Sequence, residues 1–148
     1  MTLYSFFKYL HSGFRYIVLI LLLIAMIQSL VGWLSKKPYT ETARKINLFA
    51  LISAHTQLLI GIILYFLSPL VLFSSLAMKE RTTRYFTVEH WVMMVIAIVI
   101  ITIGYSKSKK GTTAEAKYKT VAIAYIIAFA VIIFTLIIGY LPVFGSIG

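Results

Sequence analysis

The stretch that decides the fold is YIVLILLLIAMIQSLVGWL, residues 16–34. It carries no charged residue, and a helix of about 20 apolar residues crosses a hydrocarbon core about 30 Å thick. Lys8 and Arg15 precede it, as basic residues precede a signal peptide, but the apolar run is long and no small-x-small cleavage motif follows. The stretch therefore predicts a retained transmembrane helix.

Three more stretches of the same kind follow, so that the predicted helices span about residues 6–34, 42–68, 86–107 and 113–141. The chain of 148 residues is 61% hydrophobic and only 12% charged, which leaves too little polar surface to cover a soluble globule. The connections are short, and short connections favour antiparallel neighbours. We expect an all-α integral membrane protein, with residues 1–148 forming one antiparallel up-down-up-down bundle.

Basic residues in the connections predict the orientation of the bundle. One side carries Lys36, Lys37, Arg44, Lys45, Lys107, Lys109, Lys110, Lys117 and Lys119. The other side carries Lys8, Arg15, Lys79, Arg81 and Arg84. Because the side richer in Lys and Arg stays in the cytoplasm, both termini should be outside, as in a multi-pass protein of a bacterial inner membrane. The excess positive charge should attract anionic lipid rather than nucleic acid.

Threonines at two predicted helix starts have the features of N-caps. Thr40, in the segment PYTETA, is placed to cap the second helix. Thr112 and Glu115 form a capping-box pattern, in which each side chain bonds the backbone near the other, at the start of the fourth helix.

The candidate site residues are the polar side chains at membrane depth, because each of them is costly there and needs a partner. They are His11, Arg15 and, deeper, Gln28 on the first helix, His55 and Gln57 on the second, and Glu89 and His90 on the third, with Met93 in support. The fourth helix offers only Tyr125, Thr135 and Tyr140. There is no cysteine, which excludes a thiolate metal site.

Two imidazoles that face each other across a helical bundle can be the axial ligands of a haem iron. His11, His55 and His90 lie on three different helices, so the pair is not decided by the sequence. A depth count at about 1.5 Å per residue places no two of them at the same depth. Moving the helix limits by about two to four residues brings His90 close to the depth of either of the others, with His11 slightly ahead of His55. Arg15 could pair with a haem propionate, and Gly61 and Ala97 are small enough to make room for the macrocycle.

Glu89 has a simpler interpretation than its neighbour His90. It falls in the first turn of the predicted third helix, where the helix dipole favours a carboxylate. It could also pair with Arg15 or with Arg84. His90 has no such ordinary reason to stand at the start of an apolar run.

The sequence lacks the motifs of the common enzymes that act in solution. We find no Gly-rich phosphate loop, no HExxH pair and no nucleophile elbow, which argues against a hydrolase or a transferase. An electron-transfer or accessory subunit is therefore favoured over a stand-alone enzyme.

Four segments, LHSGFRY, AHTQLLIGIILYFLSP, RYFTVEHWVMM and IGYSKSKK, resemble in that order a group of small four-helix membrane proteins of Bacteroidota, usually labelled cytochrome B or cytochrome-b-like. The resemblance runs along essentially the whole chain. It implies an inner-membrane protein whose His-x-x-x-Arg, His-x-Gln and Glu-His elements fall on the six residues His11, Arg15, His55, Gln57, Glu89 and His90.

Three classes of function stay open at this point. The first is a b-type cytochrome that moves electrons between a membrane quinol and a partner. The second is an accessory or structural subunit of a larger respiratory or secretion complex, or a homodimer, without its own cofactor. The third is a quinone, proton or copper site without haem, in which Met93 and Met94 would supply soft ligands for Cu(I).

Overall fold

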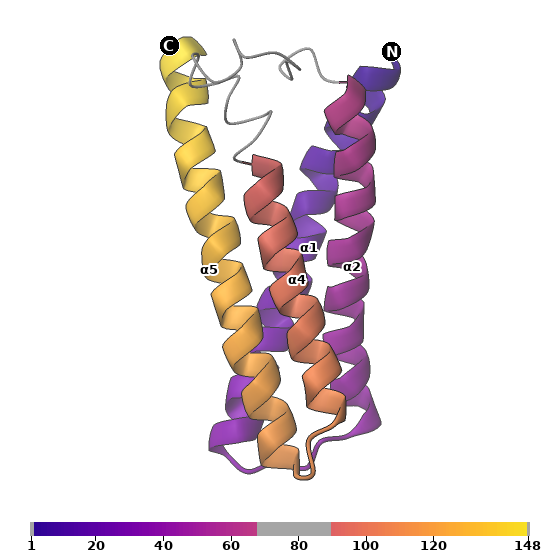
Figure 1. The fold of residues 1–148 in the computed structure, drawn as a ribbon, viewed down its shortest axis with the longest axis vertical. Helices are drawn as coiled ribbons and strands as arrows, with labels where there is room; N and C mark the ends of the chain where they lie inside the picture. Colours follow the sequence, from indigo (N-terminus) through magenta and orange to yellow (C-terminus); the bar gives the residue numbers. More distant parts are fainter. Residues whose placement is uncertain (1, 68–89, 148) are drawn as a thin grey trace.

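The computed structural model describes residues 2–67 and 90–147, with side chains up to residue 138. Within these residues the chain is α-helical, and its helices are α1 (Leu3–Leu34), α2 (Glu41–Leu67), α4 (His90–Lys109) and α5 (Ala114–Ile147). All four run along the long axis of the molecule, and both ends of the chain lie at the same end of it (Figure 1). We call this the terminal end. The opposite end, where the lysine-containing connections 35–40 and 110–113 lie, is called the basic end.

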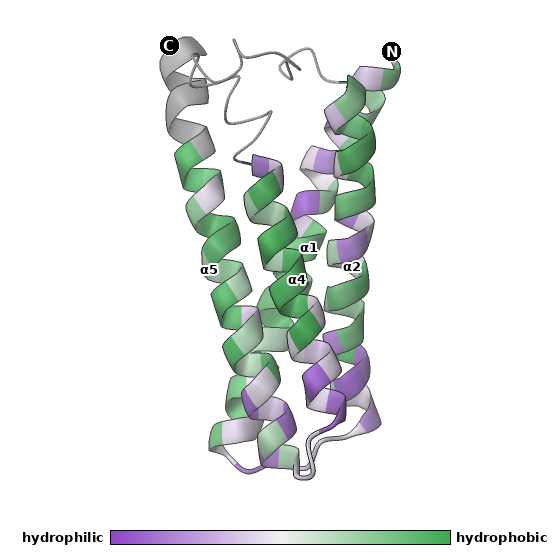
Figure 2. Cartoon of the chain, in the orientation of Figure 1, coloured by the Kyte–Doolittle hydropathy of each residue, from purple (hydrophilic) through white to green (hydrophobic). Residues whose placement is uncertain are grey.

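The described residues form four helices, as predicted, and each of these helices is long and apolar enough to cross a membrane. Large apolar side chains are exposed along every helix, as expected where lipid replaces water as the solvent. Hydrophobic residues dominate the middle of the molecule, and hydrophilic ones gather at the basic end (Figure 2).

The predicted helix limits are close to the observed ones. The second and fourth helices begin within one residue of their predicted starts, whereas α1 begins three residues earlier than predicted and α5 continues beyond residue 141 to Ile147. The predicted end at residue 68 and the predicted start at residue 86 lie outside the described residues.

One of the two predicted N-caps is in place and the other is shifted. The Thr40 hydroxyl accepts a hydrogen bond from the Ala43 N–H (3.1 Å), as predicted. For α5, however, the cap is Thr113, which accepts from the Ala116 N–H (3.0 Å), and the choice of Thr112 was wrong. The reason is that α5 begins at Ala114, and the cap is the residue immediately before the first helical one.

Small residues bring the helices together. The closest packing is between α4 and α5 and between α1 and α2, with α1 also against α5, whereas α2 and α4 pack less closely than these pairs. Ala25, Ala97 and Ala128 are fully buried where the helices meet. A Cβ added to Gly104 of α4 would collide with the Cβ of Ala124 on α5. Van der Waals contact of this kind holds membrane helices together, because lipid offers no hydrophobic driving force between them.

A buried polar network joins three helices toward the basic end. Asn47 of α2 is 0% exposed. Its side chain accepts from Gln28 Nε2 of α1 (3.3 Å) and donates to the hydroxyl of Tyr39 (3.1 Å), in the connection between those helices. The Tyr125 hydroxyl of α5 donates to the backbone oxygen of Asn47 (2.8 Å). Burial raises the pKa of Tyr39 above its usual value, so this hydroxyl stays neutral.

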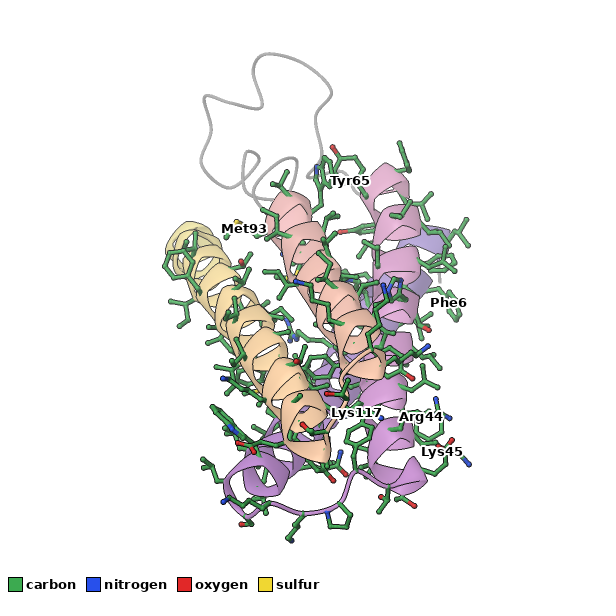
Figure 3. The ribbon with its side chains drawn as sticks, turned by 60° about the horizontal axis from the view of Figure 1, so that its bottom comes forward. Phe6, Arg44, Lys45, Tyr65, Met93 and Lys117 are labelled. Carbon is green, nitrogen blue, oxygen red and sulfur yellow. The ribbon has the colours of Figure 1, made fainter. Side chains whose placement is uncertain are left out.

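The two basic connections lie together, and Arg44, Lys45 and Lys117 stand near one another at the basic end (Figure 3). Arg44 pairs with Glu41 and donates to the Tyr105 hydroxyl of α4 (3.0 Å). Three lysine ammonium groups lie over aromatic rings; these pairs are Lys109 and Tyr105, Lys117 and Tyr39, and Lys119 and Trp33. Long basic side chains and aromatic rings are typical of the boundary between hydrocarbon and water.

The Gly104→Ala substitution should push α4 away from α5 and lower the free energy of unfolding in detergent by about 1–3 kcal/mol, as overpacking does elsewhere. Unfolding by SDS in mixed micelles, followed by circular dichroism, measures this. Gly13→Ala is the matched control, because a Cβ at Gly13 meets nothing within 4 Å. Equal stability of the two variants would contradict the close approach of α4 to α5.

The Asn47→Leu substitution should destabilise the protein by about 2 kcal/mol in the same assay, because it removes the partner of Gln28 and Tyr39. Ser53→Ala serves as its control. Ser53 is also buried on α2, but its hydroxyl donates to Ala50 O of the same helix (2.8 Å), so its loss should cost little. If both variants cost the same, the network does not join the helices.

Candidate functional site

His11 of α1 and His90, the first residue of α4 as described, lie side by side. The centroids of their rings are 6.2 Å apart, and the ring planes meet at 65°. Both belong to the half of the molecule nearer the terminal end, because α1 starts there and α4 runs from it toward the basic end (Figure 1). The structure thus brings together the two histidines that the depth count slightly favoured.

The spacing of the pair suits one metal ion between two imidazoles. A metal–imidazole bond of about 2 Å on each side places the centroids of two facing rings about 6 Å apart. The same spacing is also usual for edge-to-face packing of rings. The pair can therefore hold its geometry with or without a metal.

Gln57 and Gly61 of α2 lie against His11, although α2 supplies no histidine to the pair. Gln57 Nε2 donates to the backbone oxygen of His11 (2.9 Å). One turn later, a Cβ added to Gly61 would lie 3.4 Å from His11 Nε2 and 3.5 Å from His11 Cδ2. Residues four apart share one face of a helix, so Gln57 and Gly61 face α1 together. A side chain at Gly61 would therefore lie against the Nε2–Cδ2 side of the His11 ring.

The side chain of Gln57 keeps an unused acceptor. Its Oε1 atom is buried and has no hydrogen-bond partner among the residues that the structure describes. A buried polar atom without a partner is costly and calls for an explanation. Metal-bound histidines usually donate their second ring N–H to a neighbouring oxygen, and an acceptor beside His11 is of the right kind for that role.

Arg15 lies one turn beyond His11 on α1, further from the terminal end. Its guanidinium donates to the Tyr16 hydroxyl (3.3 Å) and lies 5.1 Å from the centroid of that ring. The ion pair found within residues 2–67 and 90–138 joins Arg44 and Glu41, so Arg15 has no carboxylate partner there. The predicted pairings of Glu89 with Arg15 or Arg84 involve residues outside the described part. Among the described residues, therefore, no carboxylate neutralises Arg15.

His55 stands apart from the pair. Its Nε2 lies 2.9 Å from the Thr102 hydroxyl of α4, and the side chain is exposed. Of the supporting residues, Met93 is half-buried near the start of α4 (Figure 3), and Met94 packs against the apolar core. Ala97, expected to make room for a macrocycle, is part of that same core.

A group of three or more His, Cys, Asp or Glu side chains that could hold a metal ion is absent from the described residues. A metal bound by protein ligands alone generally needs three or four of them. Two histidines are enough for a haem, because the macrocycle supplies the other four nitrogens. The histidine pair therefore supplies as many protein ligands as a haem iron takes.

Sequence reasoning found both histidines of the pair but missed the partners of other polar residues. Thr102 was not identified as the partner of His55, and Asn47 was not identified as a buried centre. A signal existed in the first case, since a threonine inside an apolar helix also needs a hydrogen bond. Asn47 lies only six residues into α2, where a polar residue can equally well face water at a membrane surface.

Comparisons of the chain with protein-family models, with curated proteins and with solved structures gave no match.

The Gly61→Ala substitution should leave the fold intact, because its Cβ would make only ordinary contact with the His11 ring. It should lower the amount of haem bound after reconstitution, because the methyl group would lie 3.4 Å from His11 Nε2 and crowd a macrocycle bound beside it. Haem per protein, measured from the pyridine haemochrome, tests this against Gly13→Ala, which adds the same methyl group two residues from His11 in open space. Full haem content in the Gly61 variant would show that bound haem does not lie against Gly61.

Proposed function

We propose that this chain is a cytochrome-b-like electron-transfer protein of a bacterial inner membrane, which binds haem b through His11 and His90. The observation that carries the proposal is the 6.2 Å separation of these two rings. The cytochrome-b-like group that the sequence resembles supports the same conclusion. In this function, electrons pass between a membrane quinol and a partner protein.

The residues around the pair have separate roles in the proposal. His11 and His90 hold the iron from two helices, and Gln57 fixes the backbone of His11 against α2. Arg15, a cation without a carboxylate partner in the described part of the chain, pairs with a propionate. The haem supplies a carrier of one electron, which the side chains of this chain do not provide themselves.

The proposed topology is an antiparallel bundle with both termini on the outer side of the membrane. Its support is the concentration of Lys and Arg at the basic end, which belongs in the cytoplasm by the positive-inside rule. The histidine pair then lies in the outer half of the membrane. A partner that exchanges electrons with it would dock at the terminal end.

A second candidate function is an accessory subunit of a larger membrane complex that carries no cofactor. The observation in its favour is that several polar side chains at membrane depth bond one helix to another. Gln57 bonds α2 to α1, and His55 contacts Thr102 of α4. Bonds of this kind need no function beyond assembly, and the histidine pair would then be ordinary ring packing.

The absorption spectrum of the purified protein distinguishes the two candidates. The first predicts a Soret band that shifts on reduction, and His90→Ala or His11→Ala should abolish it while the protein still inserts and purifies. His55→Ala is the matched control, because it removes the histidine that lies apart from the pair. A colourless protein that also fails to take up added haem would rule out the cytochrome. A Soret band lost only in the His55 variant would refute the assignment of ligands.

A further inference from the structure

We propose that His55 is the docking point for the headgroup of a quinol, on the lipid-facing side of the junction between α2 and α4. The proposed electron-transfer function is what selects a quinol, and it leaves His55 without a role. The structure describes His55 as exposed and in contact with a single hydroxyl, that of Thr102.

The hydrogen bonds of Thr102 decide which nitrogen of His55 carries the proton. The Thr102 hydroxyl donates its one hydrogen to the backbone oxygen of Ile98 (2.7 Å). The oxygen of the Thr102 hydroxyl also lies 2.9 Å from His55 Nε2. Because its hydrogen is already used, this oxygen must accept there and Nε2 must donate. A neutral imidazole has one donor and one acceptor. Nδ1 is therefore left as an acceptor, and it has no partner among the described residues.

The position of His55 makes this acceptor costly. His55 lies near the middle of α2 (Glu41–Leu67), about 20 Å from one end of the helix and about 18 Å from the other. Because the side chain is exposed at this depth, Nδ1 faces the hydrocarbon of the bilayer, which has no hydrogen-bond donors. A polar residue in such a place usually marks a functional contact.

A quinol matches the position and the chemistry of this acceptor. Phospholipid headgroups stay near the membrane surface. The hydrocarbon core is about 30 Å thick, so its middle is about half that distance from them. A quinol is a lipid-soluble molecule whose ring carries hydroxyl donors, and it can reach the middle of the bilayer. Because the His55 side chain is exposed at the junction of α2 and α4, a flat ring can reach it from the lipid side.

The site lies close to the histidine pair along α2. His55 precedes Gly61, which lies against the His11 ring, by six residues, or about 9 Å along the helix axis. A quinol bound at His55 would therefore be near the haem proposed for His11 and His90 without touching its ligands. His55 would then bind the electron donor, the quinol, and His11 and His90 would hold the electron acceptor, the haem.

Binding of a short-chain quinol to the purified protein in detergent, followed by isothermal titration, tests the inference with or without haem. Because Nδ1 is an acceptor, the quinol should bind at least about fivefold more tightly than the corresponding quinone, which has no hydroxyl to donate. His55→Leu should weaken quinol binding by a similar factor and remove the preference. Thr56→Val is the matched control, since Thr56 is the exposed neighbour whose hydroxyl donates to Ile52 O of its own helix.

The outcomes separate this inference from the proposed function. Quinol binding that depends on His55 in a protein without a Soret band would support the docking point and overturn the cytochrome. A normal Soret band with quinol binding unchanged in His55→Leu would overturn the docking point alone. A preference for the quinone would overturn the assignment of Nδ1 as acceptor. Loss of a dimer in His55→Leu, seen by light scattering with quinol binding unchanged, would show that a second copy covers His55 instead.

Discussion

Hydrocarbon offers no hydrogen bonds, and the arrangement of this protein depends on that constraint. Helices satisfy their own backbones, so the few polar side chains inside the membrane must find partners on neighbouring helices. The bonds from Gln28 to Asn47, from Gln57 to the backbone of His11, and between His55 and Thr102 each join two helices. Three side-chain atoms, Ser29 Oγ, Gln57 Oε1 and His55 Nδ1, have no hydrogen-bond partner among the described residues. The last two belong to α2, and Gln57 lies beside His11.

The two halves of the bundle are held in different ways. Toward the basic end, tyrosines, Asn47 and Arg44 bond α1, α2, α4 and α5 to one another, and lysines lie over aromatic rings. Toward the terminal end, the described contacts between helices include those of His11 with Gln57 and Gly61 of α2 and the ring contact of Tyr65 of α2 with Trp91 of α4.

The spans were predictable from the sequence, because hydropathy and length decide them and neither depends on contacts. The sequence slightly favoured His11 as the partner of His90 but could not decide between His11 and His55. A depth count has an error of several residues, and it says nothing about which way each helix is turned. That rotation also determines that Gly104 meets Ala124 and that Thr102 meets His55. The cap of α5 was missed by one residue for a similar reason, since Thr112 and Thr113 are equally suitable until the first helical residue is known.

Arg15 carries a consequence for the proposed electron transfer. A guanidinium that no carboxylate in the described residues neutralises creates a positive electrostatic potential around it, and in a medium of low dielectric constant that potential is poorly screened. A positive potential favours whichever state of a nearby group carries less positive charge. An iron held by His11 and His90 would therefore be easier to reduce than the same iron in a neutral bundle. A propionate placed against Arg15 would cancel much of this effect, so the position of one carboxylate would set the reduction potential of the site.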